Sequence, residues 1–143
     1  MIKKEDIEKI ALSVESGESD ELAAMLGEEI ARQFGPRDET PLCITARDAQ
    51  GMLIAGLNGV CHWRWLYVRH LWVDAPQRGR GWGRRLMAEA ERLAKDRGCV
   101  GIYVDTFDRQ AAAFYEDIGF ARAGEIVGFP PGHQRLFFRK SLE

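Results

Sequence analysis

Arg78-Gly79-Arg80-Gly81-Trp82-Gly83-Arg84 is a basic, glycine-rich segment between two regular elements. The apolar run before it, residues 65–73, is typical of a strand, and the amphipathic pattern after it, from about residue 82 to residue 97, is typical of a helix. Glycines let the backbone approach a ligand closely, and a helix start offers free N–H groups and the positive end of its dipole. The arginines add further donors for an anion. We therefore predict a binding loop for a phosphate or pyrophosphate.

The spacing of the glycines narrows the kind of phosphate loop. A dinucleotide-binding fingerprint would need a third glycine three residues after the second, where this chain has Arg84. The Gly-Lys-Ser/Thr of a Walker-type loop is absent from the sequence, and with it the usual magnesium ligand of a nucleotide hydrolase. What remains is Arg-x-x-Gly-x-Gly at the start of a helix. The alternative, a glycine-rich turn whose arginines point into solvent, stays open at this point.

The rest of the chain predicts an α/β domain around this loop. Gly98 ends the helix, and the apolar run at residues 99–104 is typical of a central strand, so strand, helix and strand form a right-handed parallel βαβ unit. The remaining elements expected from periodicity and turn signals are a strand at 7–14, a helix at 20–34, strands at 42–47 and 52–61, a helix at about 108–117, and an antiparallel strand pair at 120–127 and 134–140. We expect a mixed sheet.

Length and composition indicate one ordinary globular domain over residues 1–143. The formal net charge is −2, which gives no reason to expect a nucleic acid or an anionic membrane as partner. Cys43, Cys61 and Cys99 lack metal-ligand spacing, and we interpret them as buried thiols of a reducing compartment. The first residues lack the apolar core of a signal peptide, and no segment is long enough to cross a bilayer. We expect a cytoplasmic protein.

A second motif, Phe114-Tyr115-Glu116-Asp117-Ile118-Gly119-Phe120, follows the strand at residues 99–104. In this order and on these elements, the two motifs resemble the GNAT superfamily of N-acetyltransferases, in particular its small bacterial members. The resemblance is strong over residues 65–120, extends to the final strand pair, and covers the first forty residues only in layout. It implies an α/β fold with a mixed, mostly antiparallel central sheet, one parallel βαβ unit at a splayed strand pair, and helices on both faces.

The activity that the resemblance implies is that of an acetyl-CoA-dependent N-acetyltransferase. The acetyl group would pass directly, within a ternary complex, to a primary amine of a small molecule or peptide. Acetyl-CoA (coenzyme A) would be the co-substrate, and no metal is needed. We expect neither nucleic acid nor membrane as a partner, and a homodimer is possible because many members of the superfamily are dimers.

The resemblance makes Tyr115 the general acid that protonates the departing thiolate. A phenol with an ordinary pKa of about 10 can donate a proton to a thiolate whose conjugate acid has a pKa of roughly 8.5 at modest cost. The same residue lies on an apolar helical stripe with Ala111, Phe114 and Ile118, so the alternative is a tyrosine that only packs.

The resemblance also implies a binding site for the cofactor. The main chain of Leu71, Trp72 and Val73 would pair with the pantetheine arm, as a peptide adds to a sheet edge, and the glycine-rich loop at 78–84 would hold the pyrophosphate. Asp108 stands where the family often has asparagine. An ionised aspartate cannot donate a hydrogen bond, so Asp108 either contacts the cofactor or serves mainly as a helix N-cap.

The general base is not readable from the sequence. The strand before the loop offers Tyr67, Arg69 and His70, and strict alternation would place Tyr67 and Arg69 on one face and His70 on the other. We take His70 as the candidate base or relay, because it titrates near neutral pH, with an ordinary structural histidine as the alternative. Arg69 would suit an acceptor with a carboxylate or phosphate, whereas the acid-rich residues 15–40 would suit a cationic one.

Three other functions are compared with this one. A module of the same fold could bind or sense acyl-CoA without turnover, although the presence of Tyr115 together with the complete loop argues against it. A nucleotide enzyme is disfavoured by the glycine spacing. A nucleic-acid-binding module is disfavoured by the net negative charge and by the lack of a groove-reading motif.

Overall fold

The computed structural model describes residues 1–7 and 9–143, and these form two compact units, Met1–Pro36 and Arg37–Glu143. The first unit contains α1 (Lys4–Ile7) and α2 (Asp20–Phe34). The elements of the second unit are β1 (Thr40–Arg47), β2 (Leu53–His62), β3 (Trp65–Val73), a 3-10 turn (Ala75–Gln77), α3 (Trp82–Asp96), β4 (Gly101–Thr106), α4 (Arg109–Asp117), β5 (Ala121–Val127) and β6 (Gln134–Ser141). A single domain over residues 1–143 stays a prediction.

The first unit confirms one sequence prediction and corrects another. The helix expected at residues 20–34 forms: Ser19 caps α2, because its hydroxyl accepts a hydrogen bond from the Leu22 N–H at 3.0 Å, and Gly35 ends the helix with φ 85°. The strand expected at residues 7–14 is wrong: α1 ends at Ile7 and residues 9–14 form no strand, while residue 8 lies outside the described residues. The apolar side chains of Ile10, Leu12 and Val14 are exposed.

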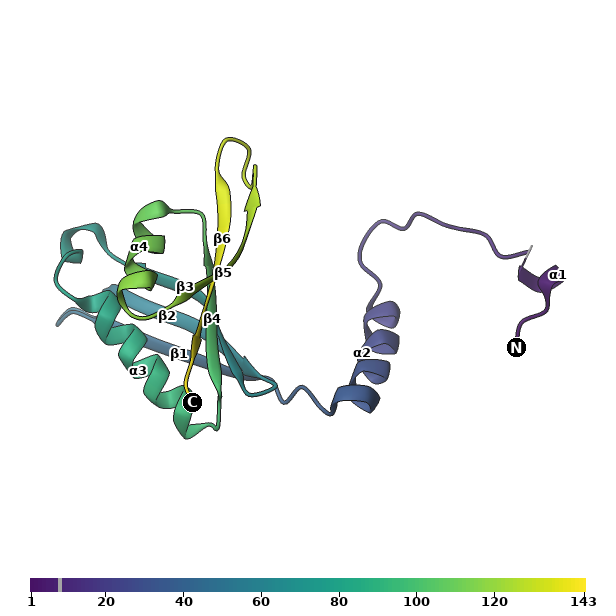
Figure 1. The fold of residues 1–143 in the computed structure, drawn as a ribbon, viewed down its shortest axis with the longest axis horizontal. Helices are drawn as coiled ribbons and strands as arrows, with labels where there is room; N and C mark the ends of the chain where they lie inside the picture. The colour runs from purple at the N-terminus through teal and green to yellow at the C-terminus, as the bar shows by residue number, and fades with distance from the viewer. Residues whose placement is uncertain (8) are drawn as a thin grey trace. The chain divides into compact units, whose positions relative to one another are not determined.

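The predicted βαβ unit and antiparallel pairs are confirmed in the second unit. The sheet order is β1-β2-β3-β4-β6-β5, with every neighbouring pair antiparallel except β3 and β4, which are parallel and joined by α3. Figure 1 shows these strands as one twisted sheet with α3 and α4 beside it. Each strand and helix of this unit begins and ends within about two residues of its predicted position.

The parallel pair β3–β4 is splayed, as the family resemblance implies. Ladder pairing runs only from Trp65–Gly101 to Val68–Val104, whereas β3 continues to Val73 and β4 continues to Thr106. Beyond Val68, one edge of β3 therefore has no strand partner, and the two strands open a gap in the middle of the sheet. This gap determines where the site lies.

A β-bulge in β3 corrects the predicted alternation of side chains. Asn58 of β2 faces His70. The next residue, Gly59, faces Val68, which leaves Arg69 as an extra residue in β3. A bulge changes the phase of the side chains, so residues on its two sides no longer alternate.

The consequence is visible in the burial of β3. Leu66 and Val68 are buried before the bulge, and the partly buried residues that join the same core after it are Leu71 and Val73. Tyr67 and His70, predicted to lie on opposite faces, therefore share the face opposite that core.

The core lies between the sheet and the helices of the second unit. Both α3 and α4 contribute to it, through Leu86, Met87, Ala90 and Ala94 from α3 and Ala112 and Tyr115 from α4. Phe138 of β6 is fully buried in the same cluster. Because both helices join one core, they cover the same face of the sheet; helices on both faces stay a prediction.

The cysteines correct one further expectation. Cys61 and Cys99 are buried, as predicted, but Cys43 is exposed, because it lies on the side of β1 that faces away from the core. Among the described residues, no helix is long and apolar enough to cross a membrane.

Candidate active site

A cleft of about 540 Å³ opens where β3 and β4 separate. It is lined by β3 from Tyr67 to Trp72, by Asp105 and Thr106 at the end of β4, and by Phe107, Ala111, Tyr115 and Arg135. Predicted residues from two distant parts of the sequence thus meet in one cleft: His70, Leu71 and Trp72 on β3, and Tyr115 on α4. Such a cleft can hold a substrate between an exposed strand edge and a phenol.

Tyr115 both packs and lines the cleft. Its side chain is only 6% exposed, and its ring lies edge-on to Phe114 and Phe120 at 5.3 and 5.6 Å and tilted against Phe138 at 5.9 Å. Burial, together with the negative charge of Asp105, raises the pKa of Tyr115 to about 12. The phenol is therefore a weaker acid than the sequence suggests, and it stays protonated throughout the neutral range.

His70 lies on the exposed part of β3 and lines the same cleft. Its Nδ1 is 3.3 Å from Nδ2 of Asn58, its cross-strand partner. An amide NH2 can only donate, so Nδ1 accepts and the proton of the neutral ring lies on Nε2. In this arrangement the neutral His70 ring can accept a further proton only at Nδ1, in exchange for the Asn58 hydrogen bond.

The predicted main-chain residues lie on the free edge of β3. Leu71 and Trp72 line the cleft, whereas Val73 is beyond it and has its carbonyl oxygen bound to Arg78 Nε at 2.9 Å. All three pair with β2 on the other edge. Their edge toward β4 has no ladder partner, so it is available to a ligand that hydrogen-bonds like a strand.

The glycine-rich loop lies between the 3-10 turn and α3. Gly79 and Gly81 both have left-handed backbones, with φ 77° and 86°, and a Cβ at either position would meet nothing within 4 Å. Gly81 is the N-cap of α3 and gives the helix no side-chain cap, and the first turn contains no acidic residue. Free helix N–H groups without a competing carboxylate are what an anion needs.

The other residues of the loop have different neighbours. Gly83 is helical, and a Cβ there would lie 3.2 Å from the Phe114 ring, so this glycine lets α3 and α4 approach each other. Arg84 forms an ion pair of 3.1 Å with Asp117 of α4. Trp82 stacks under Arg85 at 4.4 Å. The structure therefore gives Gly83 and Arg84 contacts to α4 that the sequence does not reveal.

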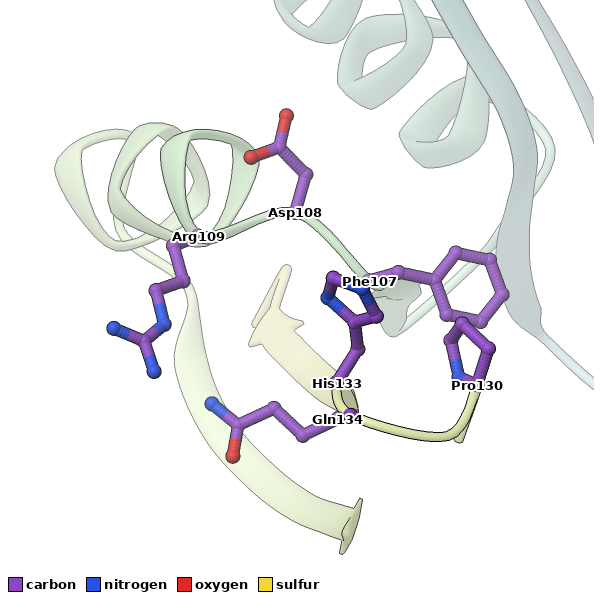
Figure 2. Close-up of a pocket in the computed structure, with 7 residues that line it drawn as sticks. Phe107, Asp108, Arg109, Pro130, His133 and Gln134 are labelled. Atoms are coloured by element: carbon purple, nitrogen blue, oxygen red, sulfur yellow. The ribbon is translucent and has the colours of Figure 1, made fainter. Parts of the chain in front are cut away.

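Asp108 is the N-cap of α4, one of the two roles considered for it. Its Oδ1 accepts a hydrogen bond from the Gln110 N–H at 2.9 Å. It lines a second pocket, of about 690 Å³, together with Phe107, Arg109 and residues of the β5–β6 turn. Figure 2 shows His133 of that turn, and Gln134 at the start of β6, among the residues that line this pocket. Phe107 lines both this pocket and the cleft, so the two adjoin.

An ion pair at the cleft was missed by sequence reasoning. Asp105, whose side chain is 10% exposed, accepts hydrogen bonds from Tyr67 Oη at 2.6 Å and Arg135 Nε at 2.7 Å. The Arg135 guanidinium also lies over the rings of Phe107 and Phe129, at 5.0 and 4.8 Å. The only signal in the sequence is a single acid directly after the apolar run 99–104, at the end where parallel strands open.

Comparisons with known proteins agree with this geometry. The profile of the Acetyltransferase (GNAT) family matches residues 7–120. The chain is 48% identical to blasticidin-S acetyltransferase of Streptomyces morookaense over 84 residues, which is 58% of this chain and 62% of that protein. It is 36% identical to acetyltransferase Atu2258 of Agrobacterium fabrum over 108 residues, which is 76% of this chain and 79% of that protein. The crystal structure of a proposed acetyltransferase from Agrobacterium tumefaciens superposes with a TM-score of 0.82 at 30% identity, covering 92% of this chain and 99% of that one.

Proposed function

The chain belongs to the GNAT family of acetyltransferases, and from this premise we propose that it transfers the acetyl group of acetyl-CoA directly to a primary amine of a small molecule or peptide. The observation that carries the proposal is the splay of β3 from β4, which leaves a strand edge and the Tyr115 side chain lining one cleft. The match covers 62% of the length of blasticidin-S acetyltransferase, so the acceptor of that protein does not carry over to this chain.

The residues present fit acetyl-CoA. The pyrophosphate would lie at the uncapped N-terminus of α3, where Gly79 and Gly81 open the backbone and Arg78 and Arg80 add positive charge. The pantetheine arm would follow the free edge of β3 at residues 71–73. When bound, acetyl-CoA supplies an activated thioester. Asp108 caps α4, which favours a structural role for this residue over contact with the cofactor.

A substitution at Gly81 tests the loop. Alanine disfavours the left-handed backbone by about 1–2 kcal/mol, so the loop conformation that presents its N–H groups is less populated and Gly81→Ala is expected to raise the KM for acetyl-CoA by about tenfold while kcat changes little. Steady-state kinetics at saturating amine measures both constants. Gly98→Ala is the matched control, because Gly98 has φ 81° and equally open surroundings but lies beyond the other end of α3. An equal rise in KM for both variants would contradict an anion site at Gly81.

The proposed chemistry uses the chain's own residues in three places. The amine nitrogen attacks the thioester carbonyl while a main-chain N–H of the free β3 edge stabilises the oxygen. The C–N bond forms and the C–S bond breaks, and Tyr115 gives its proton to the departing sulfur. The proton lost by the amine goes to a base, for which His70 is the candidate, with Nδ1 as the atom that can accept it.

The experiment begins with acetyl-CoA binding by calorimetry and continues with thiol release on a panel of amines that includes blasticidin S. Tight binding with amine-dependent thiol release supports the enzyme, and the productive amine names the acceptor class. Binding without release on any amine would favour a sensor of acyl-CoA on the same fold. No binding at all would overturn the proposal.

A further inference from the structure

The bulged residue of β3 is an arginine, and it lines the cleft. Arg69 is the extra residue between His70 and Val68, and it lines the cleft that also holds Tyr115. Bulges next to active sites commonly re-aim a side chain. Arg69 lines the cleft together with its neighbours on both sides, Val68 and His70.

The charge of Arg69 is not neutralised. Its side chain is exposed, and among residues 1–7 and 9–143 it forms no ion pair. Its guanidinium carbon lies 5.9 Å from the centre of the Tyr67 ring. The charged residues that line the cleft are Arg69, Asp105 and Arg135, in addition to the titratable His70. They comprise two cations and one anion, so the lining has an excess positive charge.

Asp105 does not offset Arg69, because it is already satisfied. Both of its oxygens accept hydrogen bonds, from Tyr67 Oη and from Arg135, and its partner Arg135 is held over phenylalanine rings. Asp105 and Arg135 thus form an ion pair in the wall of the cleft, in which each charge is neutralised by the other. Arg69 remains as the cation whose fork of N–H donors is free for a ligand.

We propose that Arg69 selects the acceptor: it binds an oxyanion, a carboxylate or a phosphate, carried by the same molecule as the reacting amine. The inference rests on the proposed function and deepens it by naming the acceptor class as anionic amines. Arg69 holds the oxyanion from β3, while the amine of the same molecule reaches the thioester beside Tyr115. A guanidinium is suited to this role because it matches either oxyanion with two parallel hydrogen bonds.

Matched acceptors test the inference. The panel is β-alanine, 2-aminoethyl phosphate, β-alaninamide and propylamine, so that charge varies while the amine stays primary. The wild-type protein is expected to acetylate one of the two anionic amines at least tenfold more efficiently, in kcat/KM, than the amide and propylamine, and which of the two is preferred identifies the oxyanion. No preference for either anion overturns the inference while leaving the acetyltransferase proposal intact.

Substitutions at Arg69 assign the preference to one side chain. Arg69→Ala is expected to lower kcat/KM for the preferred anionic amine by about 10- to 100-fold, the usual contribution of a charged hydrogen bond. The kcat/KM for β-alaninamide should change less than about threefold. Arg69→Lys should retain part of the preference, since it keeps the charge without the fork. Arg92→Ala, an exposed arginine of α3 paired with Glu89 and Asp96, is the control and should leave every constant unchanged.

Two further measurements separate the inference from other roles of Arg69. Propionate, which lacks the amine, should inhibit the wild-type protein competitively against the acceptor and should inhibit Arg69→Ala at least about tenfold less. The Kd of acetyl-CoA, measured by calorimetry, should be the same in both proteins.

A loss of acetyl-CoA binding in Arg69→Ala, or an equal loss of activity on all four amines, would overturn the inference. If wild-type protein binds acetyl-CoA but acetylates no amine at all, the proposed function fails and the inference fails with it.

Discussion

Replacing Tyr115 by phenylalanine is expected to lower kcat by about 100-fold, because a positioned general acid typically contributes 10²- to 10⁴-fold to the rate. The change removes one oxygen from a ring held by Phe114, Phe120 and Phe138, and the ring contacts remain. The KM for acetyl-CoA should therefore change little. Thiol release at saturating amine gives kcat, and calorimetry gives the cofactor affinity.

The matched control is Tyr103→Phe. Tyr103 is also partly buried, but its hydroxyl is 3.0 Å from Nε2 of His62, and it does not line the cleft. Its substitution should leave kcat within about twofold, as expected of a change outside the site. If Tyr103→Phe and Tyr115→Phe reduce kcat equally, the loss reflects packing and Tyr115 is not the acid.

The pH dependence of the reaction follows from the raised pKa of Tyr115. Burial and Asp105 raise this pKa to about 12, so the acid form persists well above neutral pH. The rate should then rise with pH as the amine acceptor loses its proton, with no decline from loss of the acid below about pH 10. A decline in kcat centred near pH 8 would show that a group other than Tyr115 donates the proton.

Replacing Phe138 by alanine is expected to lower the free energy of unfolding by about 3–5 kcal/mol, the usual cost of removing a buried phenylalanine ring. Phe138 is 0% exposed, and its ring lies 5.9 Å from that of Tyr115. The cavity would form beneath the site, so Tyr115 should also lose support. Urea unfolding followed by tryptophan fluorescence measures the change.

Phe137→Ala provides the comparison within the same strand. Phe137 is the preceding residue of β6, faces the opposite side of the sheet and is only partly buried. Its loss should cost less than half as much, since fewer apolar contacts disappear. Equal costs for the two variants would contradict the placement of the core between the sheet and the two helices.

Local patterns within the sequence were sufficient for much of the fold. Period-two and helical spacing predicted the elements of the second unit, and the order strand, helix, strand predicted the parallel pair. The glycine-rich loop was found as one contiguous stretch between a strand and a helix, whereas the role of Tyr115 came from the resemblance of the two motifs to the GNAT superfamily. The strand expected at residues 7–14 is wrong because apolar content alone does not specify a strand.

Only the tertiary structure decided what surrounds these segments. The bulge at Arg69 arises from the register of β3 against β2, and the pair of Asp105 and Arg135 joins residues 30 positions apart. Arg84, predicted as a loop residue, turns to Asp117, 33 positions away. Periodicity records which face of its own element a residue occupies. It does not record the register between strands or the neighbour across a cleft, because those depend on how whole elements meet in space.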